Sequence, residues 1–268
     1  MNSLTVAEFK SIIKDLKIKK NSSYLLHSSL RGIGLIKGIK TLDTPKFITN
    51  ELLKKIGTNG TLSALTPFYE YGLKKKKFDI KNSPSSKELG AISDFIFNDK
   101  RSFRSLNPPF NLSSIGKKAK YITYAPSPTA FGFESSWDRL FKLDSKMIFL
   151  GCNLSVCTFV RYIEFRFGVP YLYNKFFRRK ILNNGKTLSK YSSSTLRYDY
   201  FYLDYDLQNF QKFLKKKGVI NFSSNKKIEA MSINMKDCFE YGVKKLLDDI
   251  FFFLDKKPLF KKNKPPIK

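Results

Sequence analysis

The sequence predicts an α/β protein, a layered α/β/α sandwich with a central mixed sheet and an antiparallel C-terminal elaboration. Residues 5–175 alternate amphipathic segments with short apolar runs, the pattern of helices alternating with strands. After Tyr171 the pattern changes to alternating aromatic residues around an Asn-Asn-Gly turn at 183–185, which is typical of a hairpin. The 268 residues suffice for a large core and show no fixed-period repeat.

We therefore predict a single domain over 1–255. Its core spans 5–175, its hairpin and helices span 176–255, and residues 256–268 form a basic, disordered tail.

Local signals predict each element in turn. Thr5 and Glu8 form a capping box ahead of a helix whose apolar face includes Phe9 and Ile13. The Thr44-Pro45 pair starts a second helix, because proline suits the first turn. The elements of the first part are, in order, a helix from residue 5, a strand over 23–30, a helix over 44–57, a strand over 61–66, a loop over 67–85, helices over 86–98 and 135–143, and a strand over 147–151.

A further helical stretch begins at Thr158. Its face carries Thr158, Arg161 and Glu164 at successive i, i+3 positions, so these side chains point the same way. Two helices, over 207–216 and 235–254, close the chain.

The composition excludes several classes of protein. The formal net charge is +28, but the cations are mostly lysine, which makes poor bidentate contacts, so we do not expect nucleic-acid binding. The field instead favours small anionic ligands. The three cysteines form no CxxC pair, and no metal site is predicted. Without a signal peptide or an apolar run of membrane-spanning length, the chain is expected to be cytoplasmic, with no membrane span.

Eight phrases in one order resemble the aminoglycoside 3-N-acetyltransferase family, and the resemblance covers roughly residues 5–175. Members of this family acetylate an amine of an amino sugar with acetyl-CoA. The phrases are HSSLRGIG at 27–34, NGTL at 59–62, FDIKNSPSSKELG at 78–90, RSLNPPFNLSSIG at 104–116, AFGFESSWDRL at 130–140, KMIFLG at 146–151, TFVRYIE at 158–164 and VPY at 169–171.

A site for acetyl-CoA must hold a pyrophosphate. Ser28 and Ser29, followed by Gly32 and Gly34, end a strand with small residues that let backbone N–H groups approach a phosphate. The same residues are also typical of a plain capping turn, and the resemblance favours the cofactor site. The predicted cofactor-binding residues are His27, Ser28, Ser29, Leu30, Arg104, Ser105 and Ser113.

Acyl transfer to an amine requires a base, an oxyanion donor and groups that position the acceptor. The resemblance implies that Thr158 is the donor, and it places a histidine where Arg161 stands in this sequence. Arginine cannot deprotonate an amine, and an ion pair of Arg161 with Glu164 would lower the pKa of Glu164. We predict Glu164, Thr158, Arg161 and His27 as catalytic residues. The predicted acceptor-binding residues are Tyr69, Asp79, Asn107 and Glu164.

These observations predict an acetyl-CoA-dependent N-acetyltransferase acting on an amine of an amino sugar. Because aminoglycosides are polycations, a surface-polysaccharide or nucleotide-linked sugar matches the basic chain better. The alternative is a non-catalytic relative that keeps the fold and CoA binding, because Arg161 replaces the expected histidine. The aromatic-rich C-terminal part leaves a homodimer open, although such aromatics are more often core.

Overall fold

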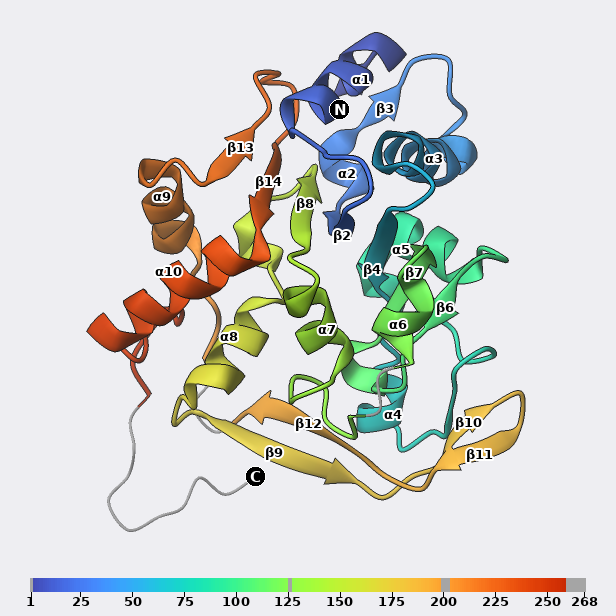
Figure 1. The fold of residues 1–268 in the computed structure, drawn as a ribbon, viewed down its shortest axis with the longest axis vertical. Coiled ribbons are helices and arrows are strands. Elements are labelled where there is room, and N and C mark those ends of the chain that lie inside the picture. The colour runs from blue at the N-terminus through green and yellow to red at the C-terminus, as the bar shows by residue number, and fades with distance from the viewer. Residues whose placement is uncertain (1, 125–126, 199–202, 259–268) are drawn as a thin grey trace.

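A seven-stranded mixed sheet forms the centre of the molecule (Figure 1). The computed structural model describes residues 2–124, 127–198 and 203–258. The strand order is β13-β14-β8-β2-β4-β7-β6. The three central strands β2, β4 and β8 are parallel, and the outer strands run antiparallel to their neighbours. Their bounds are β2 Ser23–Ser28, β4 Thr61–Leu65, β6 Phe103–Arg104, β7 Leu112–Gly116, β8 Lys146–Leu150, β13 Ile220–Phe222 and β14 Ala230–Asn234.

Helices cover both faces of this sheet, because successive side chains of a strand point to opposite sides. On β8, Met147 and Phe149 belong to one apolar core, and Ile148 and Leu150 belong to the other. One core is covered by α1 (Val6–Asp15), α3 (Thr44–Ile56) and α5 (Gly90–Asn98). The other is covered by α6 (Ala119–Thr123), α7 (Ser136–Lys142), α8 (Val160–Phe167), α9 (Gln208–Lys216) and α10 (Met235–Asp248). The predicted α/β/α sandwich is confirmed.

The antiparallel elaboration is also confirmed. Strand β9 (Leu172–Phe177) pairs antiparallel with β12 (Ser192–Arg197), and this ribbon runs along the lower edge of Figure 1. Between them β10 (Ile181–Asn183) and β11 (Lys186–Ser189) form a hairpin, whose turn ends at Gly185 with φ 78°. Strand β10 pairs in parallel with β5 (Phe78–Asp79), which attaches the hairpin to the first half of the chain.

Local helix signals were accurate at several ends. Thr5 caps α1 in a complete capping box with Glu8, and Pro45 lies in the first turn of α3. The helix predicted from residue 86 begins at Gly90, after a 3-10 turn over Lys87–Leu89. The helix predicted to reach residue 254 ends at Asp248.

Other elements were not predicted or are shorter than predicted. The strand predicted over 23–30 ends at Ser28, because Ser29 caps the short helix α2 (Leu30–Ile33). Strands β6, β7, β13 and β14 and helix α6 were not predicted. The smallest elements are β1 (Ser3–Leu4), β3 (Leu35–Ile36) and α4 (Glu70–Leu73).

Two further predictions concern membrane spans and the C-terminal end of the chain. None of the helices in the described ranges is long and apolar enough to cross a membrane. Residues 259–268 lie outside the described part of the chain, so the disordered tail stays a prediction, as does the single-domain boundary.

Candidate active site

A cavity of about 450 Å³ lies at the carboxyl ends of β2, β4 and β8. The carboxyl edge of parallel strands is where open α/β sheets bind their ligands. We call it the strand-end cavity. It brings together, from two distant segments, five of the predicted site residues: His27, Ser28, Ser29, Leu30 and Thr158.

Two close backbone contacts shape the floor of this cavity. Ser29 caps α2 by accepting a hydrogen bond from the N–H of Gly32, and its own N–H donates to the carbonyl of Leu150. A Cβ at Gly32 would lie 1.9 Å from the carbonyl oxygen of Gly151. Only glycine therefore lets α2 pack this tightly against the end of β8. Ser29 therefore caps α2, as the capping-turn interpretation of the sequence predicted.

His27 contributes a buried imidazole to the cavity wall. The ring stacks on Phe149 with centroids 4.6 Å apart and an interplanar angle of 9°. Both ring nitrogens are buried, and neither has a hydrogen-bond partner in the described part of the chain. Burial lowers the pKa of His27 to about 4, so the ring is neutral at neutral pH. His27 is therefore a weak base.

The amino end of α5 also faces the strand-end cavity, a feature that the sequence did not indicate. Residues Glu88 to Ser93 line the cavity, and Gly90 turns into the helix with φ 78°. The first N–H groups of a helix carry a partial positive charge and attract anions. This end of the cavity is therefore suited to a phosphate group.

Thr158 lies in the turn just before α8, not within the helix as predicted. Its carbonyl accepts the N–H of Arg161 at 3.1 Å. Among the described residues, neither its N–H nor its hydroxyl has a bound partner. Two donors thus remain at the amino end of a helix, beside the cavity, where they are suited to stabilise an oxyanion.

Glu164 lies two turns further along, completely buried. Its carboxyl accepts hydrogen bonds from the hydroxyls of Tyr171 at 2.6 Å and Tyr205 at 2.5 Å. Burial raises the pKa of Glu164, and this effect outweighs the two hydrogen bonds and the positive charges of Arg161 and Arg197.

The expected ion pair, and with it the lowered pKa of Glu164, is wrong. No ion pair between Arg161 and Glu164 occurs in the described part of the chain. The guanidinium of Arg161 instead lies over the rings of Phe110 and Tyr205, 5.3 and 5.2 Å from their centroids. The i, i+3 spacing correctly brings the residues near each other, but the aromatic rings hold the cation.

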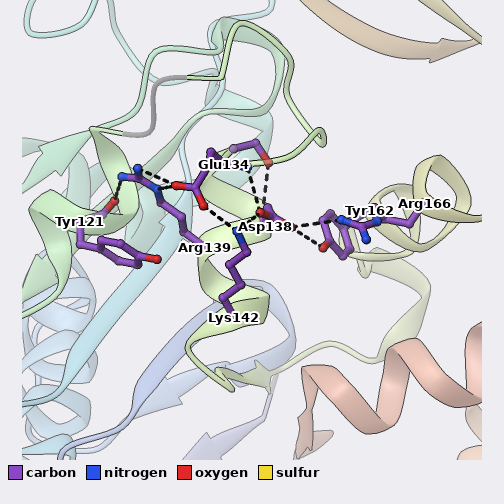
Figure 2. A network of polar contacts seen from close by, with 8 residues as sticks. Tyr121, Glu134, Asp138, Arg139, Lys142, Tyr162 and Arg166 are labelled. Carbon is purple, nitrogen blue, oxygen red and sulfur yellow. Dashed lines mark hydrogen bonds and ion pairs between the residues drawn. The ribbon is translucent and has the colours of Figure 1, made fainter.

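The other side of α8 is fixed by a polar network around Asp138 of α7 (Figure 2). The buried carboxylate accepts from the hydroxyl of Tyr162 at 2.8 Å and from Arg166 at 3.3 Å, both on α8. Lys142 forms an ion pair with it at 3.0 Å, and the N–H of Glu134 donates at 2.9 Å. This network anchors the helix that carries Arg161 and Glu164.

Three further predicted cofactor residues lie away from the strand-end cavity. Arg104 is buried, donates to the carbonyls of Thr66 and Ser83, and is flanked by two phenylalanine rings. Burial lowers its pKa to about 9. It lines a separate cavity of about 560 Å³, between the end of α5 and the hairpin. The hydroxyl of Ser105 accepts the N–H of Leu112, and that of Ser113 bonds Thr66.

These contacts connect the segment around Arg104 to the loop that follows β4. A direct contact of Arg104, Ser105 or Ser113 with cofactor stays a prediction.

The predicted acceptor residues are also dispersed. Asp79 accepts the N–H groups of Lys81, Asn82 and Gly185, which fastens the hairpin. The side chain of Asn107 donates to the carbonyls of residues 127 and 129.

Tyr69 differs from these two, because it lies near the site. Burial raises its pKa, the charge of Arg161 opposes that shift, and the charge of Glu88 adds to it. Tyr69 therefore lies within electrostatic range of both Arg161 and the cavity-lining Glu88.

Two partners of the site, Tyr205 and Arg197, were missed. The aromatic residues around 198–205 were interpreted as core or interface, and no sequence signal joins Tyr205 to Glu164 across 41 positions. Tyr171 lay within a phrase that carried the resemblance, but its contact with Glu164 was not predicted.

Comparison with known proteins gives consistent matches. Residues 25–247 match the family described as aminoglycoside 3-N-acetyltransferase. A curated relative, aminoglycoside N(3)-acetyltransferase IV of Salmonella sp, is 26% identical over 236 residues, which is 85% of this chain and 83% of that protein.

Solved structures share the fold. The apoenzyme of aminoglycoside acetyltransferase AAC(3)-IVa has a TM-score of 0.74 at 22% identity, over 94% of this chain and 91% of that one. AAC-IIIb in a binary complex with CoASH has a TM-score of 0.75 at 18% identity, over 96% of this chain and 100% of that one. AAC(3)-IIb has a TM-score of 0.76 at 17% identity, over 93% and 98% respectively.

Proposed function

The chain belongs to the aminoglycoside 3-N-acetyltransferase family, and from this premise we propose that it transfers acetyl from acetyl-CoA to an amine of an amino sugar. Acetyl-CoA is the co-substrate of this family. We further propose that the acceptor is a surface-polysaccharide or nucleotide-linked sugar and not an aminoglycoside.

One observation carries the proposal: the strand-end cavity joins the His27–Leu30 segment to Thr158 and to the amino end of α5. We propose that Ser28, Ser29 and the first N–H groups of α5 hold the phosphates of acetyl-CoA, because both segments offer donors at a positive helix end. The co-substrate supplies the acyl thioester. His27, neutral and with free nitrogens, is placed to hydrogen-bond along the same cavity wall.

We propose that residues on α8 and in the turn before it remove the proton and stabilise the oxyanion. The acceptor ammonium must lose a proton before it attacks, and the tetrahedral oxyanion must be stabilised. We assign the base to Glu164, because its raised pKa makes it a stronger proton acceptor than an ordinary carboxylate. We assign the oxyanion donor to Thr158, whose N–H and hydroxyl have no other bound partner among the described residues.

The choice of acceptor rests on charge. A chain with a net charge of +28 repels polycations over a long range and attracts anionic molecules. Amines on nucleotide-linked or glycan-bound sugars also have lower pKa values than simple alkyl amines. A weaker base than histidine suffices for them.

Calorimetry with acetyl-CoA, followed by thiol release in the same sample, tests this function. Acetyl-CoA should bind, and CoA thiol should appear with an amino-sugar acceptor. Thr158→Val should lower kcat with little change in acetyl-CoA affinity, whereas Arg101→Gln on the exposed turn at Asp99 is a control that should change neither. Absence of acetyl-CoA binding would overturn the proposal.

A second function is favoured by one observation, the arginine at position 161 where the resemblance implies histidine. The protein would then bind CoA without transferring acetyl. Under this alternative, no acceptor releases thiol from the natural chain, and Arg161→His restores turnover. Turnover by the natural chain would exclude it.

A further inference from the structure

We propose that the guanidinium groups of Arg161 and Arg197 bind an oxyanion of the acceptor, so that the preferred acceptor is an amino sugar carrying a carboxylate or a phosphate. We call these two residues the arginine pair. The inference rests on the proposed function, because it names the class of acceptor for that same site.

The arginine pair is assembled from two distant segments around one tyrosine. Arg161 belongs to the first turn of α8, and Arg197 ends β12. Both guanidinium carbons lie over the ring of Tyr205, at 5.2 Å for Arg161 and 4.5 Å for Arg197. Stacking of this kind fixes the direction of a guanidinium while leaving its N–H donors free.

The guanidinium N–H groups of the arginine pair have few acceptors among the described residues. The Nη1 atom of Arg197 is buried and has no hydrogen-bond partner among the described residues. Its one ion-pair contact, to Asp204 at 3.8 Å, involves a carboxylate whose side chain is 88% exposed, so the contact is weak. The guanidinium of Arg161 has no hydrogen bond or ion pair with a described residue. A buried donor without an acceptor is costly, and an oxyanion supplies what is missing.

Glu164 does not neutralise the arginine pair. Its two oxygens already accept hydrogen bonds from tyrosine hydroxyls, and it forms no ion pair with either arginine among the described residues. The cluster therefore holds two cations and one carboxyl group whose oxygens are occupied by neutral donors. An anion is the complementary ligand, and a second ammonium group on an acceptor is repelled.

The arginine pair also lies beside the proposed site of transfer. Arg161 follows Thr158 by one turn of chain, and the carbonyl of Thr158 accepts its N–H. Tyr69 lies within electrostatic range of both Arg161 and the cavity-lining Glu88. An acceptor whose oxyanion sits at the arginine pair has its sugar ring between this cluster and the strand-end cavity.

Calorimetry on the full chain saturated with CoA tests the inference with three probes: methyl glucosaminide, glucosaminuronic acid and uridine diphosphate glucosamine. We expect a probe with an oxyanion to bind about tenfold to a hundredfold more tightly than methyl glucosaminide, which has none; this is the range for a charge-assisted hydrogen bond. The tighter of the two anionic probes shows whether the group recognised is a carboxylate or a phosphate.

Substitutions of the arginine pair test which residues cause the preference for an oxyanion. Arg161→Gln and Arg197→Gln should each remove most of the preference for the probes that carry an oxyanion. Arg161→Lys and Arg197→Lys, which keep the charge but lose the planar fork, should fall between. Arg179→Gln is the matched control, because Arg179 also stacks on two aromatic rings, those of Tyr71 and Phe177, outside the cluster.

Two failures are distinguishable. Equal affinity for all three probes, or a preference that survives both glutamine variants in folded protein, overturns the arginine pair while the acetyltransferase proposal stands. Loss of CoA binding by the natural chain overturns the acetyltransferase proposal. The probe titrations on the CoA-free chain then still decide whether the arginine pair binds anions.

Discussion

Two buried carboxyl groups are held on opposite sides of α8, and they differ in what donates to them. Asp138 accepts a tyrosine hydroxyl, a backbone N–H and two cationic side chains, as Figure 2 shows. Glu164 accepts two tyrosine hydroxyls, and the nearby arginines form no ion pair with it among the described contacts. Burial raises the pKa of both groups, but the donors around Asp138 more than offset it and hold its pKa below the ordinary value.

Asp138 therefore has a structural role, whereas Glu164 has the environment of a reactive group. A buried carboxylate that is paired with cations and hydrogen-bond donors stabilises one arrangement of helices. It has little tendency to change its protonation state. A buried carboxylate with a raised pKa takes up a proton more readily than an ordinary one, and such groups gather at functional sites. One side of α8 therefore carries Glu164, the proposed base, and the other side carries the contacts with Asp138 that hold the helix in place.

The largest expected effect sharpens this contrast. Glu164→Gln should lower kcat for acetyl transfer by about a hundredfold to ten-thousandfold, the usual contribution of a general base. Asp138→Asn, the matched carboxyl-to-amide change, should lower kcat by less than about tenfold, because the residue only positions α8. Thiol release with saturating acceptor measures both, and equal losses would break the comparison.

Stability should show the reverse order. Asp138→Ala should lower the free energy of unfolding by about 2–4 kcal/mol, because it leaves Lys142, Arg166 and Tyr162 without their shared acceptor; the figure is reduced for the exposure of the two cations. Glu164→Gln should change it by less than about 1 kcal/mol, because the side-chain volume is kept. Urea unfolding followed by tryptophan fluorescence, reported by Trp137 of α7, measures both changes.

The pH dependence of stability should have opposite signs at the two groups. The folded pKa of Glu164 lies above its ordinary value of 4.5, so its favourable contribution is present below that pH and is lost as the pH rises through the folded pKa. The folded pKa of Asp138 lies below 3.8, so its contribution is present above that pH and is lost as the pH falls through the folded pKa.

Unfolding curves at several pH values test these signs. Relative to the natural chain, Glu164→Gln should gain stability with rising pH. Asp138→Asn should lose less as the solution becomes acidic. Parallel curves for both variants would contradict the assigned pKa directions.

The smallest effect concerns one exposed partner of Asp138. Arg166 is 42% exposed and 3.3 Å from the carboxylate. Arg166→Gln should therefore cost no more than about 1 kcal/mol, the usual limit for a surface ion pair. A loss as large as that of Asp138→Ala would show that Arg166, and not the network as a whole, anchors α8.

Two segments that the sequence predicted to belong to the site lie together in the structure. The strand ending at Ser28, the glycines after it and the Thr158 turn converge in one cavity, because parallel strands bring their carboxyl ends to one edge. The surroundings of Arg104 differ from those that the sequence suggested. An arginine near a predicted phosphate site suggests a phosphate ligand, but this one is buried against carbonyl groups and aromatic rings.

The sequence by itself determined the alternation of elements, the helix caps, the hairpin turn and the pairing of the His27–Leu30 segment with Thr158 as candidate site residues. Periodicity, capping and turn chemistry act over a few residues, so a local reading is enough for them. Only the tertiary structure decided the protonation preference of Glu164 and the free donors of Arg197. Both depend on Tyr205, which reaches α8 from 41 positions away, and on burial, which no spacing rule records.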